Sequence, residues 1–179
     1  GHHDIGHKGI SIDKKRQLIN NLKPHGKIFI TSEKPIEDEF EEYRLPVTSE
    51  NIHSLLYYAK MLIGDSQTMA TEAAIIGTPS LKCNTFAGKL SVPNELEGKY
   101  NICYAYLPKN FNHLLEKVEE LLKKDDLEKI WKKRMNKLLE NKIDVTDFMV
   151  WFIENYPKSV LKLKENPEYQ NNFIYNRND

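Results

Sequence analysis

Several residue types are scarce in this 179-residue sequence, and the scarcity excludes whole classes of protein. There are only 2 cysteines, Cys83 and Cys103, which is too few for the disulfide framework of a small secreted domain. No apolar run approaches the roughly 20 residues that a membrane-spanning helix needs, and no signal peptide is visible. We therefore expect a cytoplasmic protein without a membrane span, whose two thiols are reduced and buried.

An excess of charge of either sign is also lacking. Lys and Arg together number 26, and Asp and Glu together number 26, so the formal net charge is zero. This balance gives no electrostatic reason to expect a nucleic acid or a membrane surface as partner, although it leaves room for a local basic pocket that binds a phosphate. Walker loops, zinc fingers and Gly-x-Ser-x-Gly elements are absent from the sequence, so the functions that depend on them are excluded.

What the sequence does contain is an alternation of short apolar runs with amphipathic helical patterns. This alternation predicts βαβ units, and hence an α/β, Rossmann-like parallel sheet with helices on both faces. From residue 110 onward the pattern becomes a helical extension. The expected strands are 27–31, 45–48, 61–64, 80–83 and 102–106. The expected helices are 12–23, 49–59, 68–76, 110–123, 125–141 and 144–156, with one or two helical turns in 35–43 and one in 93–98.

The two ends of the chain carry separate expectations. The chain opens Gly1-His2-His3 without Met, so we interpret Gly1 as a remnant of cloning or of a protease site and leave open whether His2 and His3 are native. A loop that leads directly into a helix is what remains of a Rossmann-like domain whose first strand is missing, so we expect that strand ahead of residue 1. The predicted division is a Rossmann-like domain at 1–143 and a C-terminal helix with a tail at 144–179.

The stretch at 61–79, MLIGDSQTMATEAAIIGTP, carries most of the functional information. It predicts a buried strand, a short polar turn and a helix that begins at once. Parallel sheets bind ligands at the carboxyl ends of their strands, and the free N–H groups and dipole of a helix start attract phosphate. Ser66 and Thr68 would add hydroxyls, and Glu72, one turn along, would reach a ribose. The alternative is purely structural, because Ser is a common N-cap and an early Glu complements the helix dipole.

This stretch resembles the donor-nucleotide loop of the glycosyltransferase-B superfamily, where a strand ends in Asp-Ser or Ser-Gly and the next helix carries Glu-Ala and then Gly-x-Pro. It is most similar to the non-hydrolysing UDP-N-acetylglucosamine 2-epimerases. The resemblance implies that Ser66, Gln67 and Thr68 hold the diphosphate and that Glu72 holds the ribose. Gln67 and Thr68 replace two glycines of the epimerase loop, and this departure counts against epimerase chemistry. The predicted nucleotide-binding residues are Gly64, Asp65, Ser66, Gln67, Thr68 and Glu72.

Longer runs resemble the prokaryotic family known as domain of unknown function 354. The runs are HDIGHKGIS at 3–11, KIFITSE at 27–33, the stretch 52–84 and NELEGKYNI at 94–102. The resemblance implies the C-terminal, nucleotide-sugar-binding half of a two-domain protein of glycosyltransferase-B architecture, with a final helix that crosses over to the other half. The N-terminal domain, which supplies the acceptor site and much of the catalytic machinery, would then be a missing partner. We expect the 179-residue chain alone to be inactive.

Four further residues are candidates for contacts with a sugar diphosphate. In the resembled proteins the first loop faces the substrate, so His7 and Lys8 are candidates there, and His7 is the one candidate acid or base. Lys82 and Asn84 flank a later loop, which faces either the donor sugar or solvent. The His3 and His7 pair lacks firm ligand geometry, so we predict no metal site. The expected ligand is a UDP-sugar, without a further cofactor.

Two hypotheses of different classes remain at this point. The first is a donor-binding half whose parent protein transfers or epimerises a sugar. The second is a degenerate, non-catalytic module that binds a nucleotide or a protein, which the loss of the two loop glycines favours. In either case the apolar run from Phe148 to Ile153 and the tail beyond it predict self-association through the region 144–175 or a mobile tail. The alternative is a monomer whose tail folds back on its own domain.

Overall fold

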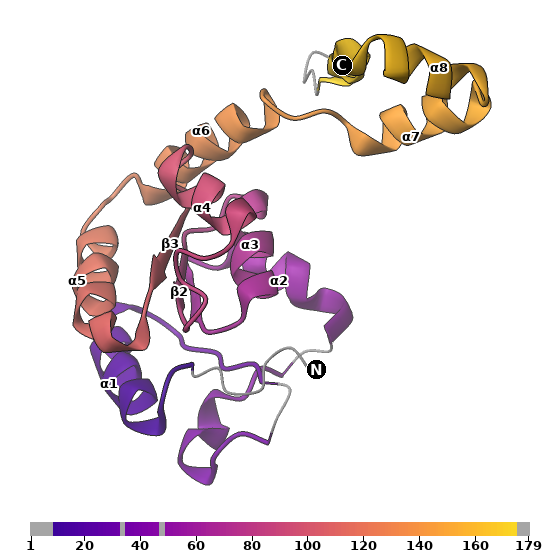
Figure 1. Cartoon of the computed structure of the whole chain (residues 1–179). Helices are drawn as coiled ribbons and strands as arrows, with labels where there is room; N and C mark the ends of the chain where they lie inside the picture. The colour runs from indigo at the N-terminus through magenta and orange to yellow at the C-terminus, as the bar shows by residue number, and fades with distance from the viewer. Residues whose placement is uncertain (1–8, 33–34, 47–48, 175–179) are drawn as a thin grey trace.

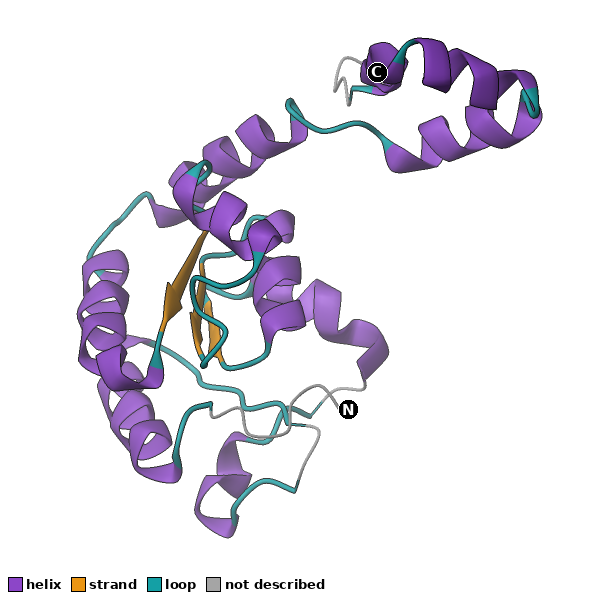
Figure 2. Ribbon diagram, in the orientation of Figure 1, coloured by secondary structure: helices purple, strands orange, loops and turns teal. Residues whose placement is uncertain are grey.

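The structure is a computed structural model that describes residues 9–32, 35–46 and 49–174. Its centre is a three-stranded sheet made of β1 (Leu62–Gly64), β2 (Ser80–Cys83) and β3 (Cys103–Tyr106). The strands are hydrogen-bonded in the order β1-β2-β3, and both neighbouring pairs are parallel (Figure 2). Ile63 lies opposite Leu81, and Leu81 lies opposite Tyr104. The predicted α/β fold with a parallel sheet is confirmed.

Helices cover both faces of the sheet (Figure 1). On one face lie α2 (Ile52–Tyr58), α3 (Gln67–Ile76) and α4 (Ser91–Gly98), and on the other lie α1 (Ile12–Leu22) and α5 (Phe111–Leu122). The alanines at 70, 73 and 74 are almost fully buried, which lets α3 pack closely on the strands. Gly77 ends α3 with φ of 97°, a left-handed conformation that favours glycine, and its N–H bonds back to the helix.

The main core lies between the sheet, α5 and α6 (Leu127–Leu139). Trp131 of α6 is fully buried, and its indole Nε1 donates to the carbonyl oxygen of Ile102 at 3.1 Å. This hydrogen bond satisfies the ring N–H inside the core and holds α6 beside the start of β3. The remaining short helices are η2 (Lys23–His25), η3 (Asp38–Tyr43), η4 (Ser49–Asn51) and η5 (Pro108–Asn110).

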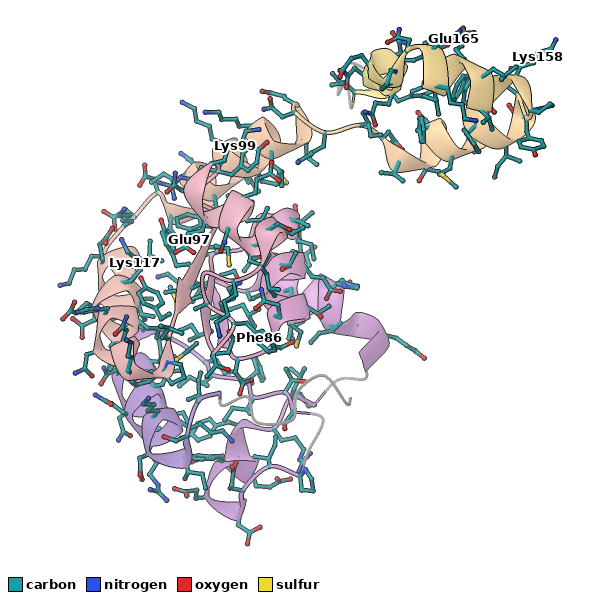
Figure 3. All side chains as sticks on the ribbon, viewed as in Figure 1. Phe86, Glu97, Lys99, Lys117, Lys158 and Glu165 are labelled. Carbon is teal, nitrogen blue, oxygen red and sulfur yellow. The ribbon has the colours of Figure 1, made fainter. Side chains whose placement is uncertain are left out.

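The C-terminal segment forms a helical hairpin away from the sheet (Figure 1). It consists of α7 (Val145–Glu154), α8 (Lys158–Glu165) and η6 (Pro167–Phe173), so part of the tail is helical, which the sequence pattern did not predict. Figure 3 shows Lys158 and Glu165 on α8 of this hairpin. Aromatic rings from α7 and η6 pack inside it; those of Trp151 and Tyr169 have centroids 4.8 Å apart. Within the described ranges, no helix has the length and apolar composition needed to cross a membrane.

The prediction of a buried strand at 27–31 is wrong. The segment is extended, but Ile30 forms only an isolated parallel bridge with Arg44, and Phe29 is 41% exposed. Among the described residues it pairs with none of the strands of the central sheet. Of the expected strand at 45–48, the structure shows only pairing beside this bridge, where Leu45 N donates to Ile30 O. Residues 47–48 lie outside the described part.

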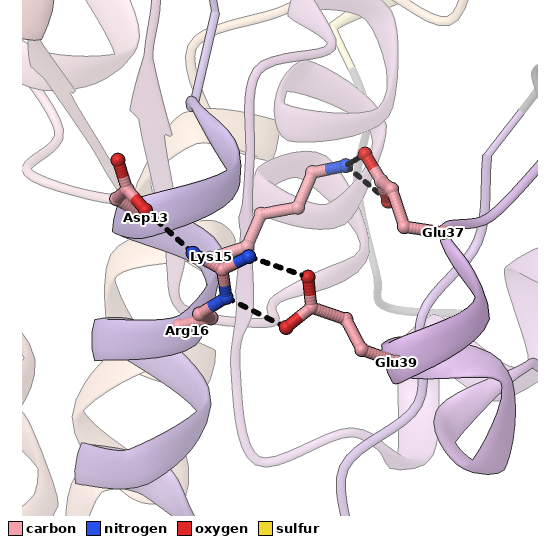
Figure 4. A network of polar contacts seen from close by, with 5 residues as sticks. All are labelled: Asp13, Lys15, Arg16, Glu37 and Glu39. Carbon is pink, nitrogen blue, oxygen red and sulfur yellow. Dashed lines mark hydrogen bonds and ion pairs between the residues drawn. The ribbon is translucent and has the colours of Figure 1, made fainter.

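A second, smaller core anchors this region to α1. Ile19, Ile36 and Phe40 are buried together between α1 and the segment that leads into η3. Ion pairs reinforce the contact: Lys15 Nζ lies 2.8 Å from a carboxylate oxygen of Glu37, and Arg16 Nε lies 2.6 Å from one of Glu39 (Figure 4). These pairs are partly exposed, so apolar burial contributes more to holding η3 on α1 than they do.

Candidate functional site

The candidate site begins where β1 turns into α3. Ser66 is the N-cap of α3, with extended backbone, and its Oγ accepts a hydrogen bond from Met69 N at 3.3 Å. Ala70 N donates to the carbonyl oxygen of Ser66 at 3.2 Å. The backbone N–H groups of Gln67 and Thr68 precede the first helical bond, and the described residues offer them no partner. The helix start therefore presents two free donors together with its dipole.

Asn84 holds this turn in place from the end of β2. Its side-chain Nδ2 donates to the carbonyl oxygen of Asp65 at 2.8 Å and lies 3.3 Å from Oε1 of Gln67. Its Oδ1 accepts from Phe86 N at 3.0 Å, and Asn84 is buried. Asn84, predicted as a contact to the sugar diphosphate, thus uses its side-chain amide for hydrogen bonds within the protein and positions the turn. Gln67 Nε2 is buried and has no partner within the described ranges.

Three of the predicted nucleotide-binding residues meet in one cavity. This cavity, of about 510 Å³, is bounded by the first two turns of α3 and by the beginning of α4, and we call it the α3–α4 cavity. Its lining includes Gln67, Thr68 and Glu72 from α3 and Ser91 and Val92 from α4. Because Thr68 and Glu72 are four residues apart in a helix, they lie on the same face, one turn from each other.

The first turn of α4 adds donors of its own. The N-cap Leu90 makes no side-chain bond to the helix, and the first α-helical backbone bond runs from Asn94 N to Leu90 O at 3.1 Å. The N–H groups of Ser91 and Val92 therefore have no partner among the described residues. Two helix N-termini line one cavity, and both place positive partial charge on it.

The other three predicted residues lie elsewhere. Gly64, Asp65 and Ser66 line a larger cavity of about 580 Å³ between β1 and the segment 27–31, which we call the β1-edge cavity. The structure thus divides the six predicted residues between two cavities on either side of one turn. His7 and Lys8 lie outside the described residues.

Glu72 also has a partner that sequence reasoning missed. His53, on α2, places its Nε2 3.3 Å from a carboxylate oxygen of Glu72. The side chain of His53 is 61% exposed and that of Glu72 is 39% exposed, so the pair lies at the rim rather than in the core. No spacing rule finds the pair, because α2 and α3 meet only through packing.

The model of the family described as "Protein of unknown function (DUF354)" matches residues 4–157. The chain belongs to this family. The match includes the sheet, the candidate site and α7 of the DUF354 chain, and it ends before α8. Neither the curated proteins nor the solved structures contain a match.

Lys82 of the DUF354 chain lies within the fold rather than at either cavity. It is 1% exposed on β2, where it shares a face of the strand with Ser80, whose hydroxyl donates to Ala70 O in α3 at 2.7 Å. Burial lowers the pKa of Lys82, and the charges of Cys103 and Glu97 act in the opposite direction. Lys82 lines neither the α3–α4 cavity nor the β1-edge cavity. The structure therefore does not bring it to Gln67, Thr68 and Glu72.

The two thiols of the DUF354 chain are free and buried, as predicted. Burial raises the pKa of Cys83 and of Cys103, which disfavours the reactive thiolate. Neither cysteine is therefore a candidate nucleophile. In the part of the chain that is described, no group of three His, Cys, Asp or Glu side chains is arranged to hold a metal ion.

Proposed function

We propose that this DUF354 protein binds the nucleotide end of a UDP-sugar in the α3–α4 cavity, as the donor-binding half of a glycosyltransferase or sugar-nucleotide epimerase-like protein. The observation that carries the proposal is that the starts of α3 and α4 line one cavity together with Glu72. Its volume of about 510 Å³ lies within the usual range of small-molecule sites.

The arrangement matches the two ends of a nucleoside diphosphate. The N–H groups of Gln67, Thr68, Ser91 and Val92 have no partner among the described residues, so they suit an anion without needing a basic side chain. Glu72 lies four residues beyond Thr68, about 6 Å along the helix axis. A carboxylate at that distance suits the vicinal hydroxyls of a ribose while the phosphates occupy the helix starts. His7 and Lys8 remain candidates for the sugar side of the ligand.

The test is calorimetric titration of the chain with UDP and, separately, with inorganic pyrophosphate. We expect Glu72→Gln to weaken UDP binding about 5- to 150-fold, which corresponds to the roughly 1–3 kcal/mol of a charge-assisted hydrogen bond. Pyrophosphate affinity should stay the same, because it has no ribose. Glu116→Gln, an exposed change on α5 across the sheet, is the matched control. Unchanged UDP affinity in Glu72→Gln would remove Glu72 from the site.

His53 gives a second control, because Glu72→Gln also breaks the pair with His53. His53→Asn removes that pair and leaves the carboxylate in place. If Glu72 binds the ribose directly, His53→Asn should keep UDP affinity within about twofold, because the interaction free energy of an exposed ion pair is small. A loss as large as that in Glu72→Gln would assign both variants to damage of the α2–α3 packing.

The second candidate function is a non-catalytic module that binds a nucleotide or a protein. It is favoured by the side chains of Gln67 and Thr68 at the helix start and by the buried Gln67 Nε2, for which the described part of the chain supplies no partner. A product assay with UDP-N-acetylglucosamine separates the two functions. We expect no transfer, epimerisation or hydrolysis by this chain alone, because closure of a second domain supplies water exclusion and orientation. Absence of turnover in the full-length parent, with UDP binding intact, would favour the module.

A further inference from the structure

The side-chain amide of Gln67 has an arrangement that the start of α3 does not explain. Gln67 is the first residue of α3, and it lines the α3–α4 cavity. Its Nε2 is buried and has no hydrogen-bond partner among the described residues. A buried donor without an acceptor destabilises a folded protein, and native structures contain few of them. An acceptor supplied by a bound molecule would remove this cost.

Asn84 fixes which end of the Gln67 amide faces the protein. The Oδ1 of Asn84 accepts from Phe86 N at 3.0 Å and its Nδ2 donates to Asp65 O at 2.8 Å, so the two ends of this amide cannot be exchanged. The same Nδ2 lies 3.3 Å from Oε1 of Gln67. Because Nδ2 can only donate, the Gln67 atom beside it must be the oxygen. The nitrogen of the Gln67 amide therefore points away from Asn84.

The direction away from Asn84 is the direction of the α3–α4 cavity, because Gln67 lines this cavity and the buried Asn84 does not. The backbone N–H groups of Gln67 and Thr68, at the same helix start, also lack partners within the described ranges. The side chain of Gln67 thus adds a third donor to two main-chain donors, and it adds no charge. Several donors at one helix start suit the oxygens of a phosphate group.

We propose that Gln67 is a specificity-determining residue of this site, whose Nε2 donates a hydrogen bond to a non-bridging oxygen of the bound diphosphate, and that Asn84 is its positioning residue. This inference rests on the proposed nucleotide site and extends it. The epimerase loop that the sequence resembles has glycine at this position, so the resemblance does not imply the contact. If the amide were turned around, its oxygen would face the phosphate and repel it. The hydrogen bonds of Asn84 prevent that orientation.

Gln67→Met tests the donor, because Met has a similar length but cannot donate a hydrogen bond. In calorimetric titrations, the affinity for pyrophosphate and for UDP should fall about 10- to 150-fold, as expected for a hydrogen bond to a charged group. The melting temperature should stay the same or rise, because the substitution removes a buried donor that lacks a partner. A merely structural role predicts the opposite, namely unchanged affinity and lower stability. Gln17→Met, an exposed change on α1 across the sheet, is the matched control and should alter neither.

Asn84→Asp tests the positioning. A carboxylate only accepts, so the Gln67 amide should turn its Nε2 toward residue 84 and its Oε1 toward the cavity. Pyrophosphate affinity should fall at least as far as in Gln67→Met. The added negative charge contributes to this fall, but it acts equally when residue 67 is Met. The loss caused by Asn84→Asp should therefore be at least about fivefold smaller in the Gln67→Met background. Equal losses in both backgrounds would remove Asn84 from the positioning role.

Nuclear magnetic resonance of the unsubstituted chain follows the contact directly and does not require Asn84→Asp to fold. The side-chain NH₂ signals of Gln67 are identified by their loss in Gln67→Met. They should shift on saturation with pyrophosphate and stay unchanged with uridine, which has no phosphate.

Three outcomes would overturn the inference and leave the proposed function standing. One is that the Gln67 signals do not move in a chain that binds pyrophosphate. Another is that Gln67→Met binds pyrophosphate as tightly as the unsubstituted chain. The third is that uridine alone shifts the signals, which would assign the contact to the nucleoside. If the unsubstituted chain binds neither UDP nor pyrophosphate, the proposed function fails, and this inference fails with it.

Discussion

Ser66 offers a way to separate the structural role of the α3 start from its proposed role in anion binding. The substitution is Ser66→Asp, with Ser66→Asn as the matched neutral control. Both Asp and Asn are good N-caps, so either side chain can accept the hydrogen bond from Met69 N that Ser66 now accepts at 3.3 Å. Stability should therefore change little in both variants, and Asp should add a few tenths of a kcal/mol through the dipole.

The two variants should differ sharply in anion binding. A carboxylate at position 66 would neighbour an anion held by Gln67 and Thr68 N–H, and a separation of about 5 Å sets the scale of their repulsion. At that separation, the repulsion between two unit negative charges is about 0.8 kcal/mol at the dielectric constant of water and about 3.3 kcal/mol at an effective dielectric constant of about 20. Ser66 is exposed, so a value between these limits applies. We expect at least a tenfold loss of UDP and pyrophosphate affinity in Ser66→Asp, while Ser66→Asn stays near the wild type.

Calorimetry with both ligands and thermal unfolding of the three proteins measure these effects. Raising the salt concentration should narrow the difference between the Asp and Asn variants, because exposed charges are screened. Equal affinities in Ser66→Asp and Ser66→Asn, with folding intact, would show that the anion does not bind at the start of α3. The prediction then fails even if UDP binds elsewhere on the chain.

Three further predictions concern the frame around the site. Trp131→Phe should lower the free energy of unfolding by about 2–3 kcal/mol in denaturant titration, because it leaves Ile102 O without its donor and opens a void; an unchanged midpoint would contradict this. Since burial lowers the pKa of Lys82 below 10.5, the unfolded state binds more protons between the two pKa values, so stability should rise with pH there. Lys82→Met should abolish that rise and stabilise the protein at neutral pH; a persistent rise would assign it to another group. Ending the chain at Lys142 should abolish self-association seen by light scattering, because Met149, Val150, Ile153 and Leu161 are exposed on the hairpin; a monomeric 179-residue chain would refute this.

The sequence by itself determined most of the local structure. The strand at 80–83 agrees with β2 residue for residue, because a short apolar run between a Gly-Thr-Pro stop and a polar loop has few alternatives. The sequence also predicts the helix at 68–76 and its end at Gly77, because N-caps and left-handed glycines reflect local preferences. The free donors at the start of α3 follow from the same local rules, which apply wherever a helix begins.

Contacts between segments distant in sequence were decided only by the tertiary structure. The residues 27–31 have strand propensity, but a strand needs neighbours along its length, and within the described ranges only the isolated bridge between Ile30 and Arg44 pairs this segment. His53 meets Glu72 only because α2 packs beside α3, and the start of α4 joins the site only because the loop after β2 returns to α3. No sequence motif marks Lys82 as buried. Its position on the covered face of β2 follows from the strand register. Local preferences act over a few residues, whereas these contacts depend on how the whole sheet and its helices pack together.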